Sequence, residues 1–424
     1  MERKLTAELW DKMHYMFRDF NDRMVHVELH YDFRIDADAL KTVLICFLEK
    51  TPVLHSSFKD NHVNPYWKVE DYKIEDVLTV LEPDNLQKVI DDFLTQYIPP
   101  ESNVQIKAAL FYEGNKSVLC IVENHMCMDG GDLKYFLNAL CSNYNDYTTQ
   151  HKSPLALRSG SRSYTEVYSD LSPMDKKAAQ KLYKNVSSRD SHKFPFSPES
   201  KEDKSFILRR RINSERFARI RAAGKKSGAT VNDILVAAYI HSIYELANYS
   251  DNEGISVSCA VDLRRYIKDI SSKGLTNHTA FMQCGTPRKG RNIVETLSYV
   301  VRSSEKSKQD KFMGLYGLPL LKLGYSIMPY AASEEVIKIG YSNPLLGMSN
   351  IGAIDGDALA LSNKKPTDAF LTGAVKYKPY ALLTATSYNN ELSLSMCVRG
   401  NEEDKKIVNT FFDYMEKNFN ELAK

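Results

Sequence analysis

The sequence predicts a mixed α/β protein that is divided into two subdomains. Stretches that alternate apolar and polar residues, typical of half-buried strands, occur beside stretches with the i, i+3, i+4, i+7 apolar spacing of helices. The chain has 424 residues, which suits two domains of about 200 residues each. Residues 145–204 are rich in Ser, Lys, Pro and Asp and carry no sustained core periodicity. We therefore expect an N-terminal subdomain over residues 1–148, a linker over 149–204 and a C-terminal subdomain over 205–424.

The composition is that of an ordinary globular protein, with 43% apolar and 26% charged residues. The net charge of +2 gives no electrostatic reason to expect a nucleic-acid or membrane-surface partner. The sequence contains no run of about 18 apolar residues, the length that a membrane-spanning helix needs. Residues 1–6 lack the apolar core of a signal peptide. The seven cysteines are scattered without a C-x-x-C pair, which favours reduced thiols. We expect a cytoplasmic monomer.

The first half begins with a short amphipathic helix over residues 5–17. A half-buried strand follows over Met24–Phe33, in which Val25, Val27, Leu29 and Tyr31 alternate with His26, Glu28, His30 and Asp32. The face with the two histidines is expected to be solvated. Positions four apart on a strand lie about 13 Å apart, so these histidines cannot share a metal, and we predict no metal site. Asp36 is expected to cap a helix that ends before Thr51-Pro52.

The second half alternates strands and helices. A strand is predicted over Ser205–Ile212, a helix to about Lys226, a long apolar helix to about Tyr249, and a strand over Gly254–Arg264. Ala381–Cys397 is expected to form a strand pair around Asn389-Asn390, followed by an amphipathic helix over Glu402–Leu422. The basic runs at 209–211 and 225–226 could contact phosphates or an acidic protein, but a solvated surface is favoured.

The most informative stretch of the first half runs from Ser117 to Tyr144. Val104–Tyr112 and Ser117–Val122 flank a turn signal, which predicts an antiparallel hairpin. The stretch ends as a helix, because Leu133, Phe136, Leu137 and Leu140 have helical spacing. His125, Asp129, Gly130 and Gly131 lie between the strand and the helix. A histidine at the tip of a buried strand, four residues before Asp-Gly, is a rare arrangement.

His125-x-x-x-Asp129-Gly130 resembles the HxxxDG motif of the chloramphenicol acetyltransferase-like superfamily. This superfamily includes plant BAHD acyltransferases, alcohol acetyltransferases, wax ester synthases and the condensation domains of nonribosomal peptide synthetases. Further segments are similar to those of the superfamily and come in the expected order, namely TPVLHSSF (51–58), GATVNDILVAA (228–238), AVDLRR (260–265) and GMSNIG (347–352). The resemblance therefore covers nearly the whole chain.

The sequence differs from the motifs of two branches of the superfamily, and these differences narrow the choice of branch. Asn124 replaces the first histidine of the condensation signature HHxxxDG, which leaves the single-histidine form that BAHD enzymes have. The BAHD segment DFGWG is absent, which disfavours the plant-type branch. The chain is most similar to the bacterial condensation-domain-like and alcohol acetyltransferase branch.

The resemblance implies two similar subdomains, each a mixed sheet flanked by helices, with a tunnel between them. It implies that His125 is the general base, a role for which neutral imidazole is suited near pH 7. It also implies that Asp129 turns away from the substrate and pairs with Arg264 of the second half. Gly130 and Gly131 would give the bend room and let substrate pass close to the backbone.

The oxyanion of a tetrahedral intermediate needs a hydrogen-bond donor. We expect it from a backbone N–H near Gly130 or from the side chain of Asn350 or Ser349. Gly131 and Asn124 are further candidates to line the tunnel. Cys127 is a poor candidate for a nucleophile, because it is two residues from His125 and poorly placed to hydrogen-bond with it.

Three functions follow from this resemblance. The favoured one is an O- or N-acyltransferase that moves an acyl group from free acyl-coenzyme A to a small alcohol or amine. The second is a free-standing condensation-type protein that joins substrates bound to acyl carrier proteins. The third is a non-catalytic interaction module. We expect no bound cofactor, since coenzyme A or another phosphopantetheine thioester would be the donor substrate.

Overall fold

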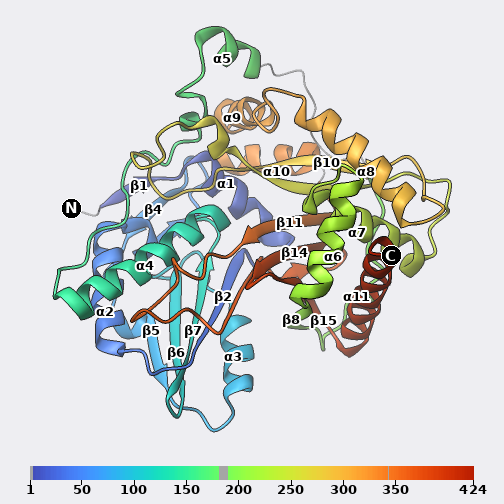
Figure 1. Cartoon of the computed structure of the whole chain (residues 1–424). Helices are drawn as coiled ribbons and strands as arrows, with labels where there is room; N and C mark the ends of the chain where they lie inside the picture. Colours follow the sequence, from blue (N-terminus) through green and yellow to red (C-terminus); the bar gives the residue numbers. More distant parts are fainter. Residues whose placement is uncertain (1–2, 181–189, 342) are drawn as a thin grey trace.

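Three β-sheets organise the chain in a computed structural model that describes residues 3–180, 190–341 and 343–424 (Figure 1). The two large sheets have five and seven strands and belong mainly to the first and second halves of the chain. The small sheet has the order β1-β4-β3 and comprises Lys4–Thr6, Tyr66–Val69 and Ser56–Lys59. The mixed α/β class predicted from the sequence is thereby confirmed.

The five-stranded sheet has the order β12-β2-β7-β6-β5. Its strands are β12 (Asp368–Thr372), β2 (Met24–Tyr31), β7 (Lys116–Asn124), β6 (Ile106–Glu113) and β5 (Leu78–Leu81). The predicted hairpin is present as β6 and β7, which pair antiparallel from Ile106↔Glu123 to Glu113↔Lys116. β12 comes from the second half but pairs with β2 in the sheet of the first, with Leu371 opposite Val27. One strand of the second half thus completes the sheet whose strand β7 leads to His125.

The seven-stranded sheet has the order β10-β9-β11-β14-β15-β13, and β8 pairs with β15. Its strands are β8 (Lys204–Ile212), β9 (Ile255–Asp262), β10 (Thr279–Thr286), β11 (Leu346–Ala353), β13 (Lys376–Tyr377), β14 (Ala381–Tyr388) and β15 (Glu391–Gly400). β11 runs parallel to both β9 and β14, whereas β14, β15 and β8 are antiparallel neighbours, so the sheet is mixed.

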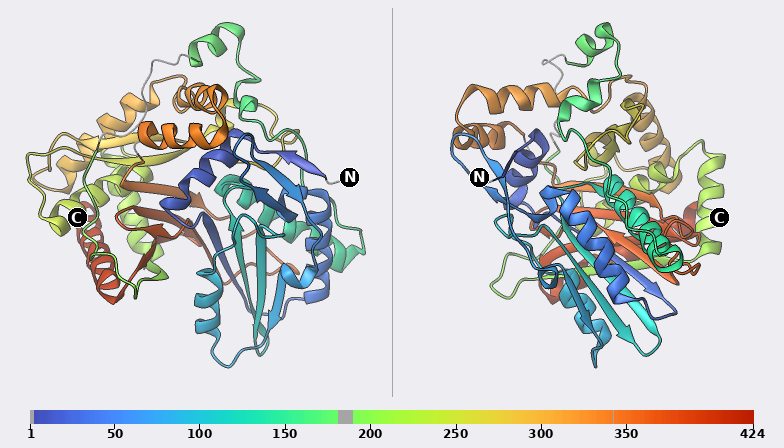
Figure 2. Two further views of the ribbon diagram at one scale, coloured as in Figure 1. Left: turned by 180° about the vertical axis from the view of Figure 1, so that it is seen from behind. Right: turned by 90° about the vertical axis from the view of Figure 1, so that its left-hand side faces the viewer.

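Helices flank both large sheets (Figures 1 and 2). Those of the first half are α1 (Leu9–Met16), α2 (Ala37–Lys50), α3 (Leu86–Leu94) and α4 (Gly130–Gln150). Those that follow are α5 (Pro173–Ala179), α6 (Ser214–Lys226), α7 (Val231–Ala247), α8 (Ile293–Lys308), α9 (Gly317–Ile327), α10 (Tyr330–Tyr341) and α11 (Glu402–Leu422). None of these described helices is both long and apolar enough to cross a lipid bilayer.

Local sequence signals explain several helix boundaries. Asp36 caps α2 as expected, because its side chain accepts hydrogen bonds from the backbone N–H groups of Asp38 and Ala39. Thr230 and Asp233 form a reciprocal capping box at the start of α7.

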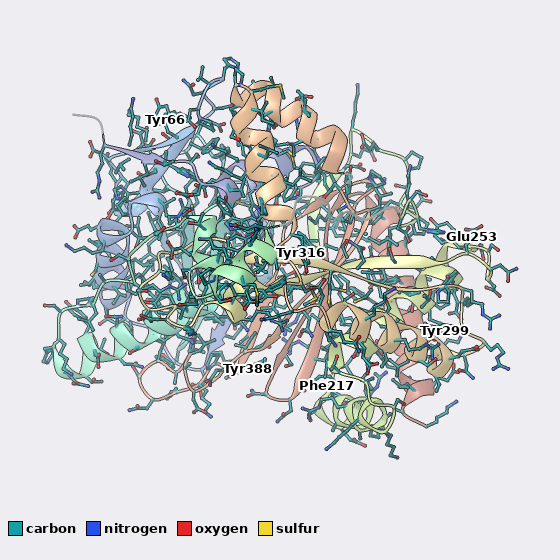
Figure 3. All side chains as sticks on the ribbon, turned by 90° about the horizontal axis from the view of Figure 1, so that it is seen from above. Tyr66, Phe217, Glu253, Tyr299, Tyr316 and Tyr388 are labelled. Carbon is teal, nitrogen blue, oxygen red and sulfur yellow. The ribbon has the colours of Figure 1, made fainter. Side chains whose placement is uncertain are left out.

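Figure 3 shows side chains packed throughout both halves, with Tyr66 of the first half and Phe217 of the second on opposite sides of that view.

The sequence predicted that the face of the strand over residues 24–33 with His26, Glu28, His30 and Asp32 is solvated. This prediction is wrong for His26, the first residue of that face. His26 is fully buried, because α3 packs across this face of the sheet with Ile90 and Leu94 in the same apolar cluster as Val122. A strand that is covered on both faces does not need polar alternation to be stable.

The linker predicted over residues 149–204 contains α5, and its residues 181–189 lie outside the described part of the chain.

Candidate active site

His125 lies one residue beyond β7, at the point where the chain bends toward α4. Its backbone N–H donates to the Arg23 carbonyl at 2.7 Å, and the Asn277 side chain donates to the His125 carbonyl at 2.7 Å. Arg23 belongs to the first half and Asn277 to the second. The backbone of His125 is therefore held from both halves of the chain.

The bend after His125 is closed by its neighbouring side chains. Asn124 Oδ1 accepts from the Met126 N–H at 3.1 Å, and Glu123 Oε1 accepts from the Met128 N–H at 3.1 Å. Asn124 was expected beside the tunnel, and the structure corrects this. It is fully buried, its amide donates to Gln105 Oε1 at 2.8 Å, and it is not among the residues that line the cavity described below.

The His125 imidazole opens into a cavity of about 270 Å³ whose walls come from both halves of the chain. The first half contributes residues of α1 and the β7–α4 junction, including Gly130 and Gly131. The second half contributes residues of β9, β10, β11 and the segment between β12 and β14. Ser349 and Asn350 of β11 are among them, so this cavity brings together His125 and both side chains predicted to donate a hydrogen bond to the oxyanion.

Asn350 is exposed, and its Oδ1 accepts from the Gly352 N–H at 3.1 Å. The oxygen of the amide is therefore used within its own strand, where the pairing of β11 with β14 shifts register. Within the described part of the chain, the amide nitrogen of Asn350 has no hydrogen-bond acceptor. Asn350 thus has a donor available at the edge of the cavity.

Asp129 is among the residues that line the cavity, but its carboxylate is saturated with hydrogen bonds. Its Oδ1 caps α4 by accepting from the N–H groups of Gly131 and Asp132 at 3.0 and 3.1 Å. Arg264 makes a bidentate pair with it, at 2.8 Å to Oδ1 and 3.0 Å to Oδ2. Oδ2 also accepts from the His278 N–H at 2.7 Å and from the Thr279 hydroxyl at 3.1 Å. The ion pair expected between Asp129 and Arg264 is present.

Arg264 also serves a second buried carboxylate, Asp132, which the sequence did not predict. Arg264 Nη2 lies 2.6 Å from Asp132 Oδ1, and Arg158 also pairs with this carboxylate. Burial would raise the pKa of Asp129, but the Arg264 guanidinium and the amide donors hold it below its usual value. Burial and the nearby charge of Asp129 raise the pKa of Asp132. Asp129 is therefore held as a carboxylate and is unsuited to accept a proton from a substrate.

Gly130 and Gly131 differ in what surrounds them. A methyl group on Gly131 would lie 2.8 Å from Arg264 Nη1 and 3.2 Å from Asp129 Oδ1, whereas one on Gly130 would have its nearest neighbour, a methyl of Ile351, at 4.0 Å. Arg264 cannot yield easily, because it is held by its bidentate pair. Gly131 is thus required for the ion pair, and Gly130 leaves open space at the cavity.

We expect Gly131→Ala to lower the free energy of unfolding by about 1–3 kcal/mol, the usual cost of overpacking a rigid site. Gly130→Ala, the matched control, should change stability by less than about 1 kcal/mol, because alanine also favours the helix. Urea unfolding of the two variants measures the difference. Equal stability of the two variants would contradict this role for Gly131.

His14 is a part of the site that sequence patterns did not indicate. It lies in α1, and its ring stacks on that of His125 with centroids 4.4 Å apart and an interplanar angle of 20°. Burial and the neighbouring His125 lower the pKa of His14 well below its usual value. Burial also lowers the pKa of His125, although Asp129 opposes this. Both imidazoles are therefore neutral at pH 7, and His125 can accept a proton.

Cys127 is excluded as a nucleophile by its surroundings. It is fully buried, and burial raises the pKa of its thiol well above the usual range. It is not among the residues that line the cavity. Among the described residues, no three His, Cys, Asp or Glu side chains come together in a group that could hold a metal ion.

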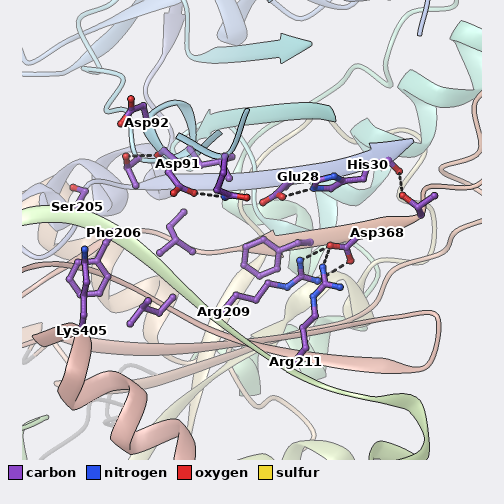
Figure 4. Close-up of a pocket in the computed structure, with 17 residues that line it drawn as sticks. Glu28, His30, Asp91, Asp92, Ser205, Phe206, Arg209, Arg211, Asp368 and Lys405 are labelled. Carbon is purple, nitrogen blue, oxygen red and sulfur yellow. Dashed lines mark hydrogen bonds and ion pairs between the residues drawn. The ribbon is translucent and has the colours of Figure 1, made fainter. Parts of the chain in front are cut away.

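A second cavity, of about 680 Å³, lies between β2, α3, β8 and β12 and does not include His125 (Figure 4). Its charged groups are largely paired with one another. Arg209 makes a bidentate pair with Asp368 at 2.7 and 3.0 Å, Arg211 joins the same carboxylate, and His30 lies 2.6 Å from Glu28. The solvated basic run expected at 209–211 is instead engaged in ion pairs, because β8 lies beside Asp368 of β12 and beside Asp413 and Glu416 of α11.

Comparison with known proteins identifies the fold of the chain that carries this site. The family model of the condensation domain matches residues 14–272, which is more than half of the chain. No curated protein matches the sequence significantly. Polyketide synthase associated protein 5 from Mycobacterium tuberculosis is a similar solved structure, with 15% identity and a TM-score of 0.67, covering 97% of this chain and 96% of that one.

Two further solved structures show the same architecture. Trichothecene 15-O-acetyltransferase from Fusarium sporotrichioides has 13% identity and a TM-score of 0.69, covering 100% of this chain and 94% of that one. The first condensation domain of the CDA synthetase has 13% identity and a TM-score of 0.68, covering 100% and 97%. The chloramphenicol acetyltransferase-like fold predicted from the sequence is thus confirmed, and the chain belongs to the condensation-domain family.

Proposed function

We propose that this protein is an acyltransferase that moves an acyl group from a thioester to an alcohol or amine, with His125 as the general base. The observation that carries the proposal is a neutral imidazole at a cavity lined by both halves of the chain, beside a carboxylate that is fully bonded elsewhere. A neutral imidazole suits proton abstraction near pH 7.

In this mechanism the hydroxyl or amine of the acceptor lies against His125. The imidazole takes its proton as the oxygen or nitrogen attacks the thioester carbonyl carbon. The tetrahedral intermediate carries its negative charge on the former carbonyl oxygen, which the free amide nitrogen of Asn350 or a backbone N–H near Gly130 would stabilise. Collapse of the intermediate breaks the carbon–sulfur bond, and the imidazolium returns the proton to the thiolate. The products are an ester or amide and a free thiol.

Asp129 takes no part in the proton transfer of this mechanism. Its function is to cap α4 and, through Arg264, to fix the bend that carries His125 against the second half of the chain. Preorganisation of this kind keeps the base within reach of the substrate throughout the reaction.

We further propose that the donor is free acyl-coenzyme A rather than an acyl carrier protein. A carrier must dock as a second protein, and the net charge of +2 does little to attract an acidic one. The condensation-type alternative remains the second candidate, because the matching family model and several similar structures are condensation domains.

The deciding experiment offers short- and long-chain acyl-coenzyme A with a panel of alcohols and amines and follows thiol release. Release from acyl-coenzyme A, with formation of the acylated acceptor, supports the proposal. Activity only when the same acyl group is loaded on a phosphopantetheinylated carrier protein would favour the condensation reaction. No activity with either donor, together with a stable protein partner, would favour a non-catalytic interaction module.

A further inference from the structure

Lys376 is a cation in the His125 cavity that the mechanism above does not use. It begins β13, the short strand between β12 and β14, and forms an isolated backbone bridge with Asn21. Lys376, His14 and His125 line the same cavity. Lys376 is only partly exposed, and its charge lies close enough to influence the titration of both histidines.

Within the described part of the chain, Lys376 has no counter-ion at bonding distance. Across residues 3–180, 190–341 and 343–424, its ammonium group makes no hydrogen bond and no ion pair. The carboxyl that acts on the pKa of Lys376 is that of Asp22. Asp22 is buried, and its Oδ1 accepts from the N–H groups of Met24 and Val375 at 2.9 and 3.0 Å. Burial raises the pKa of Asp22 to about 7, so this carboxyl is at best a partial counter-charge.

Lys376 nevertheless keeps its charge near neutral pH. Burial lowers its pKa to about 8, with Asp22 acting in the opposite direction. The two stacked histidines beside it are neutral. A partly buried ammonium without a paired anion is costly, unless a ligand supplies the anion.

The other cations that line this cavity are already engaged. Arg264 pairs with Asp129 and Asp132, and Lys134 donates to the Ile351 carbonyl at 2.6 Å. Among the described residues that line this cavity, Lys376 is thus the cation whose charged group has no hydrogen-bond or ion-pair partner, and a single ammonium suits a singly charged anion. A doubly charged phosphate group is held best by several donors, such as the planar fork of an arginine, whereas Lys376 supplies a single point charge.

We propose that Lys376 binds a carboxylate group of the substrate, so that this enzyme acts on substrates in which a carboxylate lies close to the reacting group. Two sources share this chemistry. The carboxylate belongs either to the acceptor, which is then an amino acid or hydroxy acid, or to an acyl group with a carboxylate end. This inference rests on the proposed acyl transfer and names its substrate class.

Matched acceptors and donors distinguish the two sources. The first arm compares amino acids and hydroxy acids with the amines and alcohols that lack the carboxylate. The second arm compares succinyl- with butyryl-coenzyme A. In one of the two arms, the wild-type enzyme should have a higher kcat/KM for the substrate with the carboxylate than for the matched substrate without it. Lys376→Met should reduce this ratio of kcat/KM values about 10–100-fold, the contribution of a charge-assisted hydrogen bond.

The matched control for this variant is Lys365→Met. Lys365 is half exposed, pairs with Asp357 at 2.7 Å, and does not line the cavity. Its substitution should leave the preference unchanged. A wild-type enzyme without any carboxylate preference, or a Lys376→Met variant that loses activity equally on charged and neutral substrates, would overturn the proposal.

A binding measurement tests Lys376 even if acyl transfer itself is not found. Reductive methylation of the full-length protein, followed by peptide mass spectrometry, reports how accessible each lysine is. Phenylacetate should protect Lys376 and phenylacetamide should not, whereas Lys365 should be protected by neither. Failure of protection in a protein that does transfer acyl groups would refute the carboxylate site alone. Protection in a protein that transfers none would refute the proposed function alone.

Discussion

Replacing His125 by alanine should lower turnover by about 10²–10⁴-fold, the contribution of a positioned general base. The imidazole acts on the acceptor, so binding of the acyl thioester should change little. Steady-state kinetics with an identified donor and acceptor give the loss of turnover, and calorimetric titration with the thioester gives its affinity. His62→Ala is the matched control, because His62 is exposed and does not line the cavity. Near-full activity of His125→Ala would refute the assignment.

The pH dependence of the wild-type enzyme should have a definite sign. Burial lowers the pKa of His125 below its usual value near 6.5, so the reactive neutral form persists at pH 7. Activity should therefore be level around pH 7 and should fall as the pH is lowered through this depressed pKa. The pH profile of kcat/KM measures it. An acidic limb centred above 6.5 would show that another group limits the reaction.

Much of the fold was predictable, because it is encoded in local patterns. Alternation located β2, apolar runs around a turn located the β6–β7 hairpin, and Asp36 located the start of α2. The position of β12 was not predictable in this way. A strand pairs through backbone groups that every sequence carries, so its residues do not specify that it crosses into the sheet of the other half.

The same limit explains the partial prediction of the site. His125, Asp129 and Gly130 form one short motif, and Arg264 lies in a segment that resembles a second one. His14 and Lys376 reach the cavity from α1 and β13, and neither has a neighbouring residue in sequence that marks it as functional. Asn124 directly precedes His125 in the sequence, but its side chain is buried and bonded to Gln105 and to the Met126 N–H instead of lining the cavity.

Asp132 is the second omission with an energetic consequence. It lies in the first turn of α4 and is fully buried. Arg264 therefore neutralises two carboxylates rather than one, with Arg158 assisting at Asp132. Loss of the arginine and loss of Asp129 should then have unequal effects.

Arg264→Ala should be the more destabilising of the two substitutions, with a loss of about 3–5 kcal/mol in the free energy of unfolding, because it leaves buried charge unpaired. Asp129→Ala should cost less than this, since Arg264 keeps Asp132 at 2.6 Å and Asp262 at 3.1 Å. The double variant should cost less than the sum, because each single substitution already breaks the same pair. Urea unfolding at pH 7 measures all three. Strict additivity would show that the two residues do not interact.

The deficit of Arg264→Ala should also depend on pH. In the wild-type protein Arg264 holds the pKa of Asp129 below its unfolded value of about 3.9, so this carboxylate contributes stability that is present above that pH and is lost as the pH falls through the lowered pKa. Without the guanidinium, burial raises the pKa of Asp129, so protonation on folding favours the variant at acidic pH. The difference in unfolding free energy between wild type and variant should therefore be largest near pH 7–8 and shrink toward pH 5. A deficit that is constant over this range would mean that Arg264 stabilises the bend through packing rather than through charge.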